Sequence, residues 1–143
     1  MSSGQPLNDA DRWDWLIKLR EHCVSELLKG SAGVVLTCSA LKKKYRDVLR
    51  IASYHHDTIL VHFVYLKATR EMLLARVRAR QGHYMKDDMV FSQLEDLQAP
   101  TEDERDCISV EVAGTPVEVN ELVLNDVKKA LEHVIRKQHY TEE

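Results

Sequence analysis

Glycine and proline are scarce in this chain, with five and three among its 143 residues. All-β domains built from many short strands need these residues at their turns, so the composition argues against that architecture. Cysteine is equally sparse, because Cys23, Cys38 and Cys107 are widely separated and form no C-x-x-C pair. We therefore expect neither a zinc site nor a disulfide framework, and reduced thiols in the cytoplasm are the simplest interpretation.

The chain also lacks a long apolar run and an excess of basic charge. Its longest apolar stretch, Ile59–Leu66, includes His62 and is far shorter than the ~20 residues of a membrane-spanning helix. The polar start Met1–Pro6 has no apolar core of the kind found in signal peptides. The net charge of −3 argues against nucleic-acid binding through bulk charge. We expect one globular domain that has neither a membrane nor a nucleic acid as partner.

Helical and strand-like patterns alternate along the chain. Apolar residues at three-to-four spacing predict helices, and short β-branched runs predict strands. The expected helices are Asp9–Lys29, Lys43–Ala52, Thr69–Arg80, Met85–Gln98 and Glu118–Gln138, and the expected strands are Val34–Cys38, Thr58–Leu66 and Ile108–Val112. An order of α-β-α-β-α-α-β-α is typical of α/β proteins with a mostly parallel sheet.

Polar residues follow the first expected strand, where parallel sheets bind their ligands. Ser39 and Lys42–Lys44 stand there, and their hydroxyl and ammonium groups suit an anionic ligand. A solvated start of the next helix is the alternative interpretation. Arg76 and Arg80 are four residues apart and share a helix face, so they repel each other unless an anion such as phosphate lies between them. Ordinary surface arginines would also account for that pair.

Two acidic residues precede Arg12 at the start of the first helix. Capping of the helix explains at least one of Asp9 and Asp11, and the other could orient Arg12 or act as a general base. Histidine offers no comparable pattern. His55 and His56 are adjacent rather than spaced along one helix face, so we expect no metal site.

Four segments resemble, in the right order, the sequence motifs of gluconokinases. They are Pro6–Leu16 (PLxDxDRxxWL), Cys38–Arg50 (CSALKxxYRDxLR), Arg76–Met85 (RxxxRxGHFM) and Ser92–Pro100 (SQFxxLExP). The resemblance implies an α/β, three-layer P-loop kinase-like fold of the shikimate/adenylate kinase type, with a parallel sheet. It also implies a single domain over residues 1–143, in which residues 76–100 form the lid and the helical segment after it.

The same resemblance implies ATP-dependent, Mg²⁺-assisted phosphorylation of D-gluconate to 6-phospho-D-gluconate, a step into the pentose phosphate pathway. Arg76 and Arg80 match the arginines of the family's lid, where they would stabilise charge on the transferring phosphoryl group. The cations that match the substrate pocket would meet the gluconate carboxylate, and two polar residues would meet its hydroxyls. These substrate residues are the cations Arg12, Lys42 and Arg46 and the polar residues Ser39 and Gln93.

One motif of P-loop kinases does not occur among the 143 residues. The G-x-x-x-x-G-K-[ST] loop cradles phosphates, and Gly30–Gly33 has neither its spacing nor its lysine. We therefore expect the first βαβ part to be absent, which leaves three strands here, little kinase activity, marginal stability and association into a homodimer. Two alternatives remain open: a non-catalytic fragment or regulatory form of a gluconokinase, and a kinase of another small sugar acid.

Overall fold

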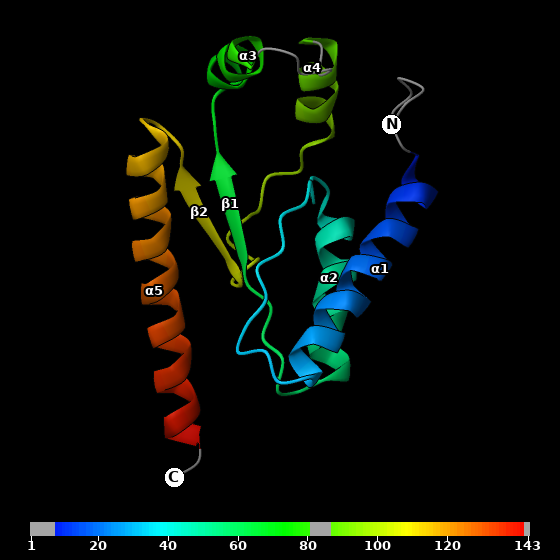
Figure 1. Ribbon diagram of the computed structural model, residues 1–143, viewed down its shortest axis with the longest axis vertical. Helices are drawn as coiled ribbons and strands as arrows, with labels where there is room; N and C mark the ends of the chain where they lie inside the picture. Colours follow the sequence, from blue (N-terminus) through cyan, green and yellow to red (C-terminus); the bar gives the residue numbers. More distant parts are fainter. Residues whose placement is uncertain (1–7, 81–86, 142–143) are drawn as a thin grey trace. The chain divides into compact units, whose positions relative to one another are not determined.

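The structure is a computed structural model that describes residues 8–80 and 87–141 (Figure 1). Its elements, in chain order, are α1 (Asp9–Leu28), α2 (Lys43–His55), β1 (Phe63–Lys67), α3 (Arg70–Ala79), α4 (Asp87–Asp96), β2 (Cys107–Glu111) and α5 (Pro116–Thr141). Contacts divide the chain into two compact units. The first contains residues 1–61 and 96–99, and the second contains residues 62–95 and 100–143.

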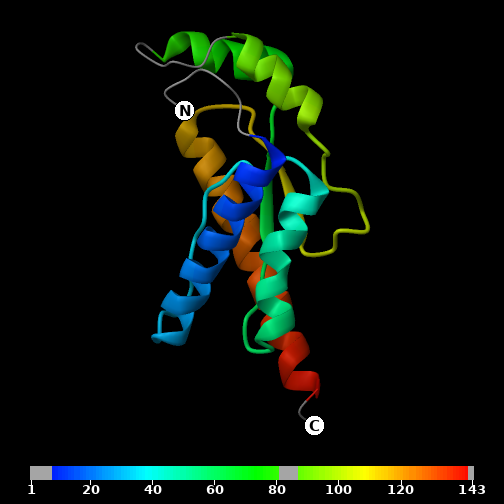
Figure 2. The same cartoon turned by 90° about the vertical axis from the view of Figure 1, so that its right-hand side faces the viewer.

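Helices α1 and α2 lie side by side in the first unit, as both ribbon views show (Figures 1 and 2). The side chain of Asn8 caps α1 by accepting a hydrogen bond of 2.8 Å from the backbone N–H of Asp11. Asn8 rather than Asp9 is therefore the cap, which leaves the Asp9 carboxylate available for other partners. At the other end, Gly30 adopts a φ of +108° and donates to the carbonyl of Leu27 at 3.0 Å, which closes the helix as expected.

The core of the first unit lies between these two helices. Val24 of α1, Ala52 of α2 and Ile59 form one buried cluster, against which Leu27 and Val61 pack. The residues of α2 expected to face inward are all buried, which confirms the apolar face that their spacing predicts: Tyr45, Val48, Leu49 and Ala52. This packing fixes the start of α2 beside the start of α1.

The second unit is built on two parallel strands. Phe63 of β1 lies opposite Cys107 of β2, and the register continues to Lys67 opposite Glu111. The connection between the strands carries α3 and α4, and α5 packs against β2 as it runs back along it (Figure 1). Thr69 caps α3 by accepting a hydrogen bond of 3.3 Å from the N–H of Met72, as its position in the sequence predicts.

The α/β class with a parallel sheet is confirmed, but the expected number of three strands is wrong in the described part of the chain. Residues Val34–Cys38 pair with no neighbouring strand there, and Val35 is 94% exposed. Their β-branched side chains favour an extended backbone, but a strand also needs a neighbour that satisfies its N–H and C=O groups. The expected strand Thr58–Leu66 likewise shortens to Phe63–Lys67, where β2 lies opposite.

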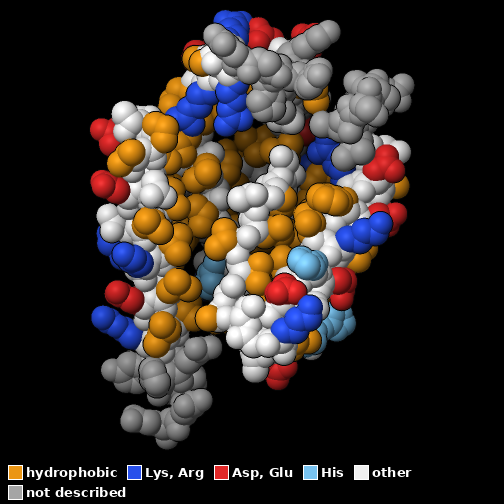
Figure 3. Space-filling view, viewed as in Figure 1, with side chains coloured by type: hydrophobic (Ala, Val, Ile, Leu, Met, Phe, Trp, Pro, Cys, Tyr) orange, Lys and Arg blue, Asp and Glu red, His pale blue; other side chains and the backbone are white. Residues whose placement is uncertain are grey.

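Several large apolar side chains remain exposed on the second unit. On α5 they include Leu122, Leu124, Leu131 and Ile135, each between 45% and 54% exposed, and Figure 3 shows uncovered hydrophobic side chains along this helix. Leu66 of β1 is 53% exposed. Exposed apolar surface of this extent favours association.

Candidate functional site

The starts of α1 and α2 bring together several of the residues predicted to bind substrate. Asp9, at the first position of α1, accepts hydrogen bonds from the Nζ of Lys44 and from the hydroxyl of Tyr45. The Nζ of Lys42 lies 3.7 Å from Oδ1 of the same carboxylate. One acidic side chain therefore organises three residues at the beginning of the neighbouring helix.

These contacts set the protonation state of the cluster. The hydrogen bond from Lys44, followed by the one from Tyr45, lowers the pKa of Asp9 to about 2. Burial, together with the hydrogen bond to Asp9, raises the pKa of the Tyr45 hydroxyl. At neutral pH Asp9 is thus a carboxylate and Tyr45 an uncharged donor. A carboxylate of such low pKa is a poor general base, so the geometry favours the orienting role for Asp9.

Three cations surround the ring of Tyr45, which is only 1% exposed. The guanidinium carbon of Arg12 lies 6.0 Å from the ring centroid, and the ammonium groups of Lys42 and Lys44 lie at 5.8 and 5.5 Å. Cations at this distance are attracted to the ring. The aromatic face thereby holds positive charge in one place, as the binding of a small anion requires.

A buried arginine of α2 hydrogen-bonds to the segment that leads into this helix. Arg46 is 4% exposed, and its Nη1 donates to the carbonyls of Ala40 and Leu41 at 3.1 and 3.3 Å. Ser39, just before them, is exposed. The sequence predicts Arg46 as a substrate ligand, and that stays a prediction; these contacts show that Arg46 supports the segment that presents Ser39 and Lys42.

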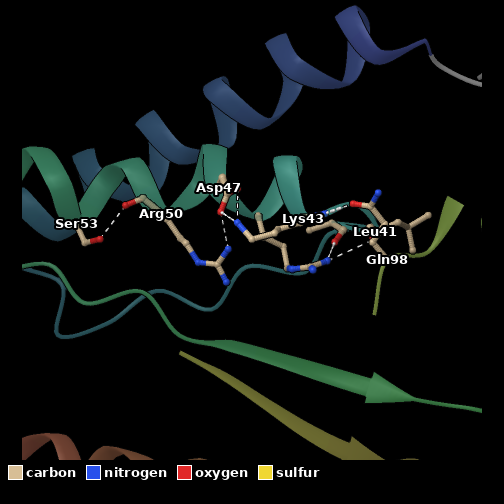
Figure 4. Close-up of polar contacts among 8 residues, drawn as sticks. Leu41, Lys43, Asp47, Arg50, Ser53 and Gln98 are labelled. Carbon is tan, nitrogen blue, oxygen red and sulfur yellow. Dashed lines mark hydrogen bonds and ion pairs between the residues drawn. The ribbon is translucent and has the colours of Figure 1, made fainter. Parts of the chain in front are cut away.

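A second support comes from a distant part of the chain, as Figure 4 shows. The backbone N–H of Gln98 donates to the carbonyl of Leu41 at 2.8 Å, and the Oε1 of Gln98 accepts the N–H of Lys43 at 2.9 Å. The Oδ1 of Asp96 lies 3.4 Å from the Nζ of Lys42. The last residue of α4 and the residues just after this helix therefore help to define the candidate site.

A groove of about 480 Å³ adjoins this cluster in the first unit. Its lining combines two aromatic residues, two aliphatic residues, three cations and one acid: Trp13, Tyr54, Val48, Ile51, Lys43, Lys44, Arg50 and Asp47. Asp47 is engaged by the Nζ of Lys43 at 2.9 Å and by Nη1 of Arg50 at 2.7 Å (Figure 4). Lys44 belongs both to this groove and to the Asp9 cluster.

The predicted lid arginines belong to the second unit and differ in their contacts. Nη2 of Arg76 donates to the carbonyl of Val112, just after β2, at 2.9 Å. Arg78, between the two predicted residues, pairs instead with Asp87 of α4 at 2.5 Å. Arg80 is exposed at the end of α3. An acid thus relieves the charge of Arg78, and a backbone carbonyl engages Arg76.

A cation–π contact also joins α3 to α4. The guanidinium carbon of Arg70 lies 4.1 Å from the ring centroid of Phe91. With the Arg78–Asp87 pair, this contact holds the two helices of the predicted lid segment at both ends of α3. The residues between these helices, 81–86, lie outside the described part of the chain, and so does the end of the third motif.

The predicted site residues fall into two groups. The first unit contains Asp9, Asp11, Arg12, Ser39, Lys42 and Arg46, and the second contains Arg76, Arg80 and Gln93. Asp9, Arg12 and Lys42 meet around Tyr45. The sequence reasoning missed the roles of Tyr45, Asp96 and Gln98, and it named Lys44 only as one of the cations that suit an anionic ligand. All four stand inside the motif segments, but only their tertiary contacts show what they do.

The described residues contain neither a candidate metal centre nor a candidate membrane span. No group of three or more His, Cys, Asp or Glu side chains there could hold a metal ion. Within the same ranges, no helix combines the length and the apolar character needed to cross a bilayer.

Comparison with known proteins identifies close relatives, although no family model matches the chain. A probable gluconokinase of Schizosaccharomyces pombe is 51% identical over 130 residues, which are 90% of this chain and 67% of the relative. The thermosensitive gluconokinase of Escherichia coli is 41% identical over 112 residues, or 78% of this chain and 57% of that protein. The chain therefore spans between about half and two thirds of the length of such curated relatives.

Solved structures give the same result. The crystal structure of a gluconokinase from Sinorhizobium meliloti superimposes with a TM-score of 0.79 at 33% identity, covering 96% of this chain and 73% of that one. A sugar kinase from Janibacter superimposes with a TM-score of 0.74 at 36% identity, covering 87% and 68% of the two chains.

Proposed function

Because the chain belongs to the gluconokinase family, we propose that it forms the gluconate-binding and lid part of an enzyme that phosphorylates D-gluconate with ATP. The observation that carries this proposal is the ring of Arg12, Lys42 and Lys44 around Tyr45. D-Gluconate is a small anion with a carboxylate at one end and hydroxyls along its length. Its charge and its hydrogen-bonding groups match those of the cluster.

In this proposal the two ends of the substrate meet different groups. The cations Arg12 and Lys42 form charge-assisted hydrogen bonds with the gluconate carboxylate. The exposed hydroxyl of Ser39 binds the substrate's hydroxyls, and the ionised Asp9 holds Lys42, Lys44 and Tyr45 in position. Gln93, in the second unit, stays a ligand of the substrate's hydroxyls that only the sequence motif predicts.

The phosphoryl end of the reaction depends on the second unit. ATP with Mg²⁺ supplies the phosphoryl group in kinases, and planar guanidinium groups suit its oxygens. Arg80, which is exposed just after the end of α3, is the residue we assign to the transferring phosphoryl group, together with Arg76, four residues earlier on α3. The 143 residues hold no G-x-x-x-x-G-K-[ST] loop, so the phosphate cradle is not part of the chain described here.

That same observation favours a second candidate, a form that binds gluconate without phosphorylating it. Phosphoryl transfer depends almost wholly on positioning and electrostatic stabilisation, and the loop supplies much of both. An ADP-release assay on the 143-residue chain with D-gluconate and ATP tests the non-catalytic form. We expect turnover no higher than in a blank without protein, and turnover like that of a full-length relative would exclude the non-catalytic form.

Calorimetric titration of the same chain with D-gluconate tests the binding itself. We expect saturable binding that D-sorbitol, which has hydroxyls but no carboxylate, does not reproduce. Lys42→Ala and Arg12→Ala each remove a charged hydrogen bond and should weaken binding by about tenfold or more. Lys18→Ala removes an exposed cation from α1 outside the cluster and is the matched control. Equal affinity in all four proteins would contradict the assignment.

A further inference from the structure

We propose that Gln98 is a positioning residue that fixes the substrate loop, residues 39–43, by capping helix α2 from a remote part of the chain. The inference rests on the proposed function, since Ser39 and Lys42 in this loop are assigned to the substrate. Gln98 itself is assigned no contact with gluconate. Its effect on binding passes through the backbone of the loop.

Helix α2 begins without a side-chain cap of its own. Its N-cap residue is Lys42, with an extended backbone at φ −96° and ψ 146°, and its side chain makes no capping hydrogen bond. Helix starts normally recruit Ser, Thr, Asp or Asn at this position, because the first backbone N–H groups have no partner within the helix. Here the Oε1 of Gln98, 55 residues further along the chain, accepts the N–H of Lys43 at 2.9 Å.

The backbone of Gln98 also holds the loop. Its N–H donates to the carbonyl of Leu41 at 2.8 Å, and the buried Arg46 donates to the carbonyls of Ala40 and Leu41. Leu41 is thus bound both by Gln98 and by a side chain of α2. These bonds leave the peptide groups on either side of Lys42 little freedom to rotate.

A third contact from the same segment is an ion pair with the side chain of Lys42, which we assign to the substrate. The Oδ1 of Asp96 lies 3.4 Å from the Nζ of Lys42, which also lies 3.7 Å from Oδ1 of Asp9. Lys42 is thereby held between two carboxylates, while its backbone is fixed by Gln98. Residues 96–99 therefore control both the backbone and the side chain at this position.

The course of the chain makes these contacts unusual. Residues 96–99 belong to the first unit, although Glu95 before them and Pro100 after them belong to the second. Only these four residues of this stretch belong to the first unit. They include Asp96 and Gln98, which contact residues 41–43. We infer that holding the substrate loop is the role of this short segment.

Amide hydrogen exchange and gluconate titration of the 143-residue chain test the inference together. Gln98→Leu keeps the approximate volume but removes the acceptor oxygen, so exchange at the Lys43 N–H should accelerate by about fivefold or more. Because the loop then samples more conformations, gluconate affinity should fall by a similar factor. Gln98→Glu keeps an acceptor at the helix start and should restore affinity, while slowing exchange at Lys43 by about two- to fivefold. Glu102→Leu, at an exposed position four residues further along the chain, is the matched control.

The two measurements distinguish a positioning residue from a merely structural one. Faster exchange in Gln98→Leu with unchanged gluconate affinity would overturn the inference, and so would unchanged exchange. If Gln98→Leu does not fold, hydrogen exchange in Gln98→Glu tests the inference instead. Protection of the Lys43 N–H no greater than in the unaltered chain would then overturn the inference. If the unaltered chain binds no gluconate, the proposed function fails. In that case the exchange rate at the Lys43 N–H alone tests whether Gln98 fixes residues 39–43.

Discussion

Tyr45 of α2 donates a hydrogen bond from its hydroxyl to the carboxylate of Asp9, the first residue of α1. The two residues are 36 positions apart, and this bond joins the starts of the two helices. Tyr45 presents its ring to three cations while its hydroxyl holds the acid. Removing either partner should therefore disturb the geometry of the whole cluster.

The contribution of Asp9 to stability should depend on pH. The hydrogen bonds from Lys44 and Tyr45 lower the pKa of Asp9 from its ordinary value of 3.8 to about 2, so its contacts stabilise the folded state fully above about pH 4. This stabilisation is lost as the pH falls through about 2. Thermal unfolding of the unaltered chain and of Asp9→Asn across this range measures the difference. We expect the gap in Tm to be constant near neutral pH and to close towards pH 2. Asp11→Asn, in the same helical turn, is the control, and an equal gap at all pH values would contradict the prediction.

Arg76 should matter for the stability of the second unit. Its hydrogen bond of 2.9 Å to the carbonyl of Val112 ties α3 to the end of β2. Arg76→Ala should lower the free energy of unfolding by about 1 kcal/mol, the usual worth of such a bond. Arg78→Ala breaks only an exposed ion pair with Asp87 and should cost less than about 0.5 kcal/mol. Urea titration of both variants checks the order, and a larger effect at Arg78 would show that the carbonyl bond is not important.

The two groups of site residues should affect different kinetic constants. In a longer form of the chain that includes a phosphate-binding loop, Arg80→Ala should lower kcat by about a hundredfold, because it acts on charge that develops in the transition state. Lys42→Ala should chiefly raise the KM for gluconate, because it removes a contact made by bound substrate throughout the reaction. Steady-state kinetics measures both. A change confined to the gluconate KM in Arg80→Ala would show that Arg80 is not a lid residue.

The unpaired apolar segment at Val34–Cys38 should promote association. Val35 is 94% exposed and lies in a β-branched run that has no neighbouring strand among residues 8–80 and 87–141. We expect the 143-residue chain to form homodimers or larger species, which size-exclusion chromatography with light scattering detects. Val35→Thr keeps the shape and reduces the apolar surface, so it should shift the distribution towards monomer. Ala113→Ser, at an exposed position just after β2, is the control, and a purely monomeric unaltered chain would refute the prediction.

Local sequence was enough to predict most of the helices and their ends. The spacing of apolar residues predicts α1 to Lys29 where the structure ends it at Leu28, and Thr69 is the observed cap of α3. The buried face of α2 also follows from spacing alone. These features depend on residues within about one turn of each other, so a short window of sequence contains the information.

Pairing and site geometry depend on residues far apart in the chain, and only the tertiary structure decides them. Val34–Cys38 has the composition of a strand but no partner among the described residues, whereas Phe63–Lys67 becomes β1 because β2 lies opposite. The sequence motifs indicate Arg12 and Lys42 as binding residues, but the ring that gathers them belongs to Tyr45. Gln98 likewise caps α2 from a position 55 residues away in the sequence. The free N–H groups at a helix start donate to any acceptor oxygen that the packing places there, whatever its position in the sequence.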